Sequence, residues 1–201
     1  MVTHLTNKIH MLERMVNISE NDLVIDIGSN DATSLKAYKS KCRKVGIDPT
    51  GKKFIEYYTD DICLIPDFFS AGVFRKQFPN EKAKIITSIA MFYDLENPAA
   101  FVRDIESVLD NTGIWHFEQS YMPSMLRTNS YDTICHEHVE FYSFKVVKNL
   151  LGQCGMRVLD VQMNAINGGS FAVTACKKDS TLKSNLPIIK WMLRQEDDMG
   201  L

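Results

Sequence analysis

Short apolar runs that alternate with helix-like segments are the feature that most constrains the fold of this sequence. Leu23–Ile27 is a β-branched apolar run, which predicts a strand buried on both faces of a sheet. Further runs predict strands at 44–48, 62–65, 84–89 and 113–118. Helical patterns lie at 5–16, 32–41 and 98–109, the last with Asn97 as its N-cap. The alternation predicts a doubly wound, mostly parallel α/β sheet covered by helices.

The last two strands are expected to pair differently. Met156 to Gln162 and Ser170 to Cys176 are separated by a short turn that contains Asn167-Gly168-Gly169. A connection of that length cannot hold a crossover helix, so an antiparallel hairpin is predicted. A parallel sheet closed by such a hairpin is typical of nucleotide-dependent methyltransferases rather than of dinucleotide-binding dehydrogenases.

Length and composition restrict the class of protein. The 201 residues fit one domain over 1–201, with an N-terminal helix in 1–20 and a helical tail in 181–201. A net charge of −2 argues against a nucleic-acid binder. No apolar run reaches the ~18 residues of a membrane span, and the N-terminus lacks the pattern of a signal peptide. Five cysteines without a CxxC pair favour reduced thiols and a cytoplasmic location.

The turn after the first strand predicts a nucleotide-type ligand. Gly28 permits a tight turn, and Asn30 tolerates positive φ better than most residues. The third glycine of a pyrophosphate-binding turn is missing. The acidic residues Asp26 and Asp31 favour a cationic ligand, so the turn fits S-adenosylmethionine better than NAD.

Polar residues at the ends of the next strands extend this predicted donor site. Asp48 is placed to accept hydrogen bonds from ribose hydroxyls, and Asp67 with Phe68 could bind and stack on adenine. The alternative is that Asp26 and Asp48 are solvated residues at strand ends and that Gly28 only marks a loop. The predicted donor-binding residues are Asp26, Gly28, Ser29, Asn30, Asp31, Asp48, Asp67, Phe68 and Ser88.

A histidine cluster, Cys135-His136-Glu137-His138, lies in the segment 121–142, which is predicted to be irregular. Loops that follow strands often hold ligands in α/β sheets. A histidine can act as a general base, and a neighbouring carboxylate can orient it. A zinc site is one alternative, but the histidines are only two residues apart and no CxxC pair exists, so no metal is predicted. The other alternative is that both histidines are structural hydrogen-bonding groups.

Six stretches occur in an order that matches one known family. The sequence resembles the methyltransferase domain of S-adenosylmethionine-dependent sugar C-methyltransferases, which methylate a keto-sugar carried on a nucleotide. The resemblance covers nearly the whole chain. The stretches are Val24-Ile25-Asp26-Ile27-Gly28-Ser29-Asn30-Asp31, Gly46-Ile47-Asp48-Pro49, Asp94-Leu95-Glu96-Asn97-Pro98, Glu118-Gln119-Ser120-Tyr121, Asp132-Thr133-Ile134-Cys135-His136-Glu137-His138 and Asn167-Gly168-Gly169-Ser170.

The resemblance implies a role for each member of the histidine cluster. His138 would be the base that removes the proton next to the ketone, and the enolate would then attack the sulfonium methyl group. Glu137 and His136 would orient the base or hold the enolate oxygen. The implied partner is a small-molecule acceptor, of the nucleotide-sugar type. Cys135 stands where better-known members have tyrosine, so a phenol contact to the substrate is lost.

The resemblance also leaves alternatives open. Those members carry an N-terminal zinc domain and a further C-terminal α/β domain, so the chain is expected to be a fragment of a longer protein. One alternative function is O- or N-methylation of a small molecule. Another is a non-catalytic module that only binds the methyl donor.

Overall fold

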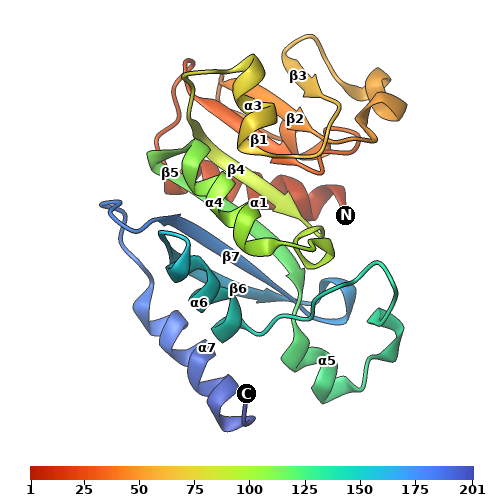
Figure 1. Cartoon of the computed structure of the whole chain (residues 1–201), viewed down its shortest axis with the longest axis vertical. Helices are drawn as coiled ribbons and strands as arrows, with labels where there is room; N and C mark the ends of the chain where they lie inside the picture. The colour runs from red at the N-terminus through yellow and green to blue at the C-terminus, as the bar shows by residue number, and fades with distance from the viewer. The chain divides into compact units, whose positions relative to one another are not determined.

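The computed structural model describes residues 1–201, with every side chain except that of Asn167. Seven strands hydrogen-bond in the order β3-β2-β1-β4-β5-β7-β6, with helices on both faces of the sheet (Figure 1). This architecture confirms the predicted α/β class. The strands are β1 Leu23–Ile27, β2 Arg43–Ile47, β3 Ile62–Ile65, β4 Ala83–Ile89, β5 Leu109–Ser120, β6 Met156–Asn164 and β7 Ser170–Lys177.

Helices and 3-10 turns connect these strands. The α-helices are α1 Val2–Met15, α2 Thr33–Lys36, α3 Ala71–Gln77, α4 Pro98–Val108, α5 Met122–Thr128, α6 Phe144–Gln153 and α7 Leu186–Asp198. The 3-10 turns are η1 Gly51–Tyr57, η2 Phe92–Asp94, η3 Tyr131–Thr133 and η4 Ile166–Gly168. Among the described residues, no helix has the length and apolar character needed to cross a membrane.

The chain divides into two compact units, of which the first comprises residues 1–88 and 107–115. In this unit β1 pairs in parallel with β2 and with β4, and β2 pairs in parallel with β3. Every residue of β1 is buried, which confirms the expectation of a strand covered on both faces. The prediction of one domain over residues 1–201 stays a prediction.

The second unit comprises residues 89–106 and 116–201. Here β6 and β7 form the predicted antiparallel hairpin, drawn in blue in Figure 1, and α6 and α7 pack against β6. The side-chain oxygen of Asn97 accepts a hydrogen bond from the amide of Ala100 at 3.0 Å, which confirms the predicted N-cap of α4. The hairpin and its two helices supply part of the core of this unit, together with buried residues of α4 and β5.

The predicted helix over 32–41 is wrong beyond Lys36, because α2 is a single turn. The reason is a long-range contact from α1. The Glu13 carboxylate accepts hydrogen bonds from the amides of Lys39, at 3.1 Å, and Ser40, at 2.7 Å. Amides that would continue the helix are therefore paired with a side chain instead of with the preceding carbonyls.

The segment 121–142 is only partly irregular, because α5 and η3 form within it. Pro123 lies in the first turn of α5, where its missing N–H costs nothing, and Asn129 ends the helix with φ 51°. The structure adds α3 and α6, which the sequence pattern did not predict. Ser143 caps α6 by accepting a hydrogen bond from the Val146 amide at 3.3 Å. β5 is also longer than its predicted range of 113–118.

Candidate functional site

The glycine turn (residues 28–32) joins β1 to α2 in the first unit. Gly28, Asn30 and Ala32 have φ values of 73°, 46° and 60°. Asn30 therefore has the positive φ that its residue type was expected to tolerate. The Gly28 amide donates to the Ile47 carbonyl at 2.9 Å, which ties the start of the turn to the end of β2.

Asp48 fixes the shape of the glycine turn from the adjoining loop. One carboxylate oxygen accepts a hydrogen bond from the Asn30 amide at 2.9 Å. The other accepts from the amide and the hydroxyl of Thr50, at 2.6 and 2.7 Å. Asp48 is buried, so the alternative of a solvated strand-end residue is wrong for this position.

Tyr58 is a second support of the glycine turn, and no sequence motif marks it. Its hydroxyl donates to the Asn30 carbonyl at 2.9 Å and lies 2.7 Å from the Ser29 hydroxyl. Because the Tyr58 hydroxyl donates its proton to the hydrogen bond with the Asn30 carbonyl, its oxygen accepts the hydrogen bond that the Ser29 hydroxyl donates. Ser29 is buried against this phenol, so its side chain holds the turn in place.

This packing requires a glycine at Gly46, the last residue but one of β2. A Cβ atom there would lie 2.6 Å from the Ser29 hydroxyl oxygen and 2.9 Å from the Tyr58 ring. We expect Gly46→Ala to destabilise the protein by about 1–3 kcal/mol, because the turn and the tyrosine must both move. Urea unfolding measures the change.

A matched control is Gly152→Ala in α6. A Cβ atom there meets no atom within 4 Å. Alanine is also the better helix former, so this variant should gain about 0.5–1 kcal/mol. Equal stabilities for the two alanine variants would contradict the close approach at Gly46.

Asp26, near the end of β1, is a buried carboxyl group beneath the glycine turn. The hydroxyls of Thr87 and Ser34 donate hydrogen bonds to it. Burial nevertheless raises its pKa from 3.8 to about 7, and the nearby carboxylates of Asp48 and Asp31 add to the rise. The buried position rules out the solvated alternative for Asp26 as well.

This raised pKa predicts a pH-dependent stability. Below about pH 4 the carboxyl is neutral in both the folded and the unfolded chain, and the folded state carries no penalty. As the pH rises to about 7, only the unfolded chain ionises freely, so the free energy of unfolding falls and then levels off. The interval from 3.8 to about 7 corresponds to roughly 4 kcal/mol.

Asp26→Asn should remove this dependence. We expect the variant to gain stability relative to the wild type between about pH 5 and pH 8, measured by urea unfolding at each pH. Asp31→Asn is the comparison, because hydrogen bonds from Thr33 outweigh burial and hold the pKa of Asp31 below its usual range. If D26N and the wild type showed the same dependence of the free energy of unfolding on pH, the raised pKa of Asp26 would not be its cause.

The remaining predicted donor residues lie in three different settings. The Asp31 carboxylate accepts from the amide and hydroxyl of Thr33, so it orders the start of α2. Asp67 is exposed after β3 and accepts a hydrogen bond from the amide of Phe68, a residue that is 77% exposed. Ser88 is fully buried and accepts a hydrogen bond from the Trp115 indole at 3.0 Å. Donor contacts at these positions stay predictions.

His138, in the second unit, is held by its own loop. Its Nδ1 atom lies 2.9 Å from the Thr133 carbonyl oxygen, and its amide donates to the Cys135 carbonyl at 3.2 Å. Because a carbonyl can only accept, Nδ1 must carry the proton. In the neutral ring, Nε2 is then left with a free lone pair, which is the arrangement a general base requires.

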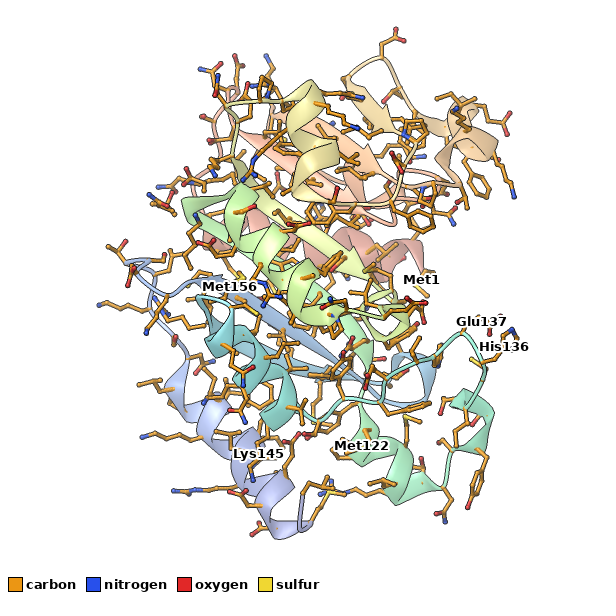
Figure 2. The ribbon with its side chains drawn as sticks, in the orientation of Figure 1. Met1, Met122, His136, Glu137, Lys145 and Met156 are labelled. Carbon is orange, nitrogen blue, oxygen red and sulfur yellow. The ribbon has the colours of Figure 1, made fainter. Side chains whose placement is uncertain are left out.

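His136 and Glu137 do not converge with His138. The His136 side chain is 92% exposed, and its Nε2 atom lies 3.4 Å from a carboxylate oxygen of Glu137. Figure 2 shows both side chains projecting outward from the loop. A hydrogen bond from the Cys135 thiol and the charge of His136 hold the pKa of Glu137 below its usual value. Their catalytic roles stay predictions.

A metal site gains no support from the side chains that the structure describes. Among them, no group of three or more His, Cys, Asp or Glu residues is arranged to hold a metal ion. The cysteines Cys42, Cys63, Cys135, Cys154 and Cys176 are free thiols.

Comparison with known proteins identifies the family. A family model described as a methyltransferase domain matches residues 7–161. The C-methyltransferase NovU of Streptomyces niveus is 24% identical over 202 residues, which cover 100% of this chain and 48% of NovU. The chain thus spans about half the length of this curated relative.

Two solved structures show the same fold. One comes from the complex between the Haloferax volcanii Trm112 methyltransferase activator and the putative methyltransferase, with a TM-score of 0.69 and 15% identity over 87% of this chain and 90% of that chain. Another is the magnesium protoporphyrin IX methyltransferase ChlM of Synechocystis PCC 6803 with bound SAH, with a TM-score of 0.65 and 12% identity over 88% of this chain and 83% of that chain. The chain therefore belongs to the methyltransferase domain family and has the class I fold of S-adenosylmethionine-dependent methyltransferases.

Proposed function

We propose that this protein transfers a methyl group from S-adenosylmethionine to a carbon next to a ketone, in a keto-sugar carried on a nucleotide. The observation that carries the proposal is the His138 ring, whose Nδ1 atom is fixed by the Thr133 carbonyl so that Nε2 is free to accept a proton. The name of the relative NovU, a C-methyltransferase, supports carbon as the methylated atom.

The acidic residues around the glycine turn suit the positive charge of the methyl donor. S-adenosylmethionine supplies an electrophilic methyl group on a positively charged sulfur. Asp26, Asp31 and Asp48 gather acidic groups around the turn, which suits a cationic ligand and disfavours a pyrophosphate. A bound cation near Asp26 would favour the ionised carboxyl, so donor affinity is expected to rise with pH towards about 7.

His138 would perform the proton transfer of the reaction. Its Nε2 atom takes the proton from the carbon next to the ketone, and the electrons of that C–H bond move into the enolate. The Thr133 carbonyl holds the proton on Nδ1 and thereby stabilises the imidazolium that forms. The enolate carbon then bonds to the methyl group, and the electrons of the broken C–S bond remain on sulfur.

Solvent exchange tests this chemistry directly. A panel of nucleotide-linked keto-sugars is incubated with the protein in deuterated water, without donor, and followed by mass spectrometry. We expect deuterium at the carbon next to the ketone, and methylation of the same carbon once donor is added. His138→Ala should remove both while it leaves donor affinity unchanged.

Two outcomes would overturn the proposal. Methylation without deuterium exchange would favour transfer to oxygen or nitrogen. Donor binding without transfer to any acceptor of the panel would favour a donor-binding module without catalysis.

A further inference from the structure

Tyr93, in η2, makes the closest ring contact of His138. The centroids of the two rings lie 4.2 Å apart, with their planes inclined by 52°. The Tyr93 carbonyl also accepts hydrogen bonds from the amides of Val139, at 3.0 Å, and Glu140, at 3.1 Å. One residue therefore holds both the imidazole and the backbone that follows it.

The carboxyl, thiol and phenyl groups nearest to His138 offer no free hydrogen-bond donor to a negative oxygen. Asp94 and Glu137 are the carboxyl groups whose charges act on His138. The Cys135 thiol already donates to Glu137. Phe141, whose ring centroid is 6.3 Å from that of His138, has no polar atom. An enolate that forms beside this base thus needs a neutral donor from elsewhere.

The Tyr93 hydroxyl meets this need. It forms no hydrogen bond with any side chain or backbone group that the structure describes. Burial, together with Asp94, raises its pKa above the usual value, so the hydroxyl keeps its proton at neutral pH. A protonated phenol can donate to a carbonyl oxygen and to the enolate oxygen that replaces it.

We propose that Tyr93 is the second acceptor-binding residue: its ring positions the imidazole of His138, and its hydroxyl donates a hydrogen bond to the ketone oxygen of the acceptor. This inference rests on the proposed function. As His138 takes the proton from carbon, the C–H electron pair moves towards the ketone oxygen. The phenol donates to this oxygen and keeps its own proton, so no further reactant is needed.

The hydroxyl is tested by Tyr93→Phe in the deuterium-exchange assay. The variant keeps the aromatic ring and loses only the hydroxyl that would donate a hydrogen bond to the ketone oxygen. We therefore expect the rate constant for exchange to fall by about 10²–10³-fold. Tyr131→Phe is the matched control, because Tyr131 lies in the segment that also holds His138 but is 77% exposed. We expect its exchange rate constant to stay close to that of the wild type. An exchange rate for Y93F within about threefold of the wild type would overturn the role of the hydroxyl.

The ring is tested without any substrate. Nitrogen NMR shifts of the His138 ring, at about pH 8.5 where histidines are neutral, report which nitrogen carries the proton. We expect the Nδ1–H form in the wild type and in Tyr93→Phe, and a mixture of both forms in Tyr93→Leu. An unchanged tautomer in Y93L would overturn the positioning role.

The two assays separate the possible failures. A wild-type protein that exchanges no deuterium into any keto-sugar would refute the proposed function and, with it, the role of the hydroxyl. The NMR measurement would still decide whether Tyr93 positions His138.

Discussion

His138→Asn should strongly slow deuterium exchange and methyl transfer while the loop keeps its structure. The asparagine amide can still donate to the Thr133 carbonyl, which accepts from Nδ1 at 2.9 Å in the wild type. It offers no basic nitrogen in place of Nε2. A general base contributes about 10²–10⁴-fold to a rate, so we expect a loss of that size in the rate constant for exchange. Donor affinity, measured by calorimetry, should not change.

The same substitution at His136 separates the two histidines of the cluster. A shared catalytic role predicts comparable losses for both variants. The 92% exposure of the His136 side chain predicts a much smaller loss, which is the result we expect. Exchange by H138N at the wild-type rate would mean that another group removes the proton.

Local patterns predicted the framework of both units. Leu23–Ile27 is a strand with the bounds that its β-branched run indicates, because a buried parallel strand needs apolar residues on both faces. The short turn before Ser170 predicted the antiparallel hairpin, and Asn97 predicted the start of α4. These features depend on neighbours in the sequence, so they can be read without a structure.

The features that were missed depend on contacts between distant residues. Glu13 ends α2 from another helix, and Tyr58 supports the glycine turn from 28 residues away. The contact between Tyr93 and His138 joins residues that are separated in the chain by the whole of α4, β5 and α5. The histidine motif identified His138, but no local pattern shows which ring nitrogen is free or that His136 is exposed.

Glu196→Ala should be among the most destabilising substitutions in the second unit. Glu196 lies in α7, and its side chain is fully buried. One carboxylate oxygen accepts from the Tyr121 hydroxyl, at 2.8 Å, and from the Phe144 amide. The other accepts from the Lys145 amide at 2.7 Å. The carboxylate thus caps the N-terminus of α6 and fixes the tyrosine that precedes α5.

Alanine would leave three buried or half-buried donors without a partner. A hydrogen bond to a charged group contributes about 1.5–3 kcal/mol, so we expect a loss of about 3–5 kcal/mol in the free energy of unfolding, measured with urea. Glu196→Gln should recover only part of the lost stability. The NH₂ group of glutamine cannot accept a hydrogen bond, so it would face a backbone N–H without pairing with it. Burial and this carboxylate raise the pKa of Tyr121 far above its usual value. In E196A the pKa of Tyr121 should fall towards the usual value of a tyrosine.

Asp197→Ala is the matched control on the next residue of α7. Its carboxylate pairs with the Lys145 ammonium group at 2.9 Å, but this pair is largely exposed. Exposed ion pairs contribute about 0–1 kcal/mol, so the control should remain close to wild-type stability. If E196A lost no more stability than D197A, the buried carboxylate would not be what joins α7 to the start of α6. The intact cap would then have to come from Ser143 alone, which bonds to the Val146 amide.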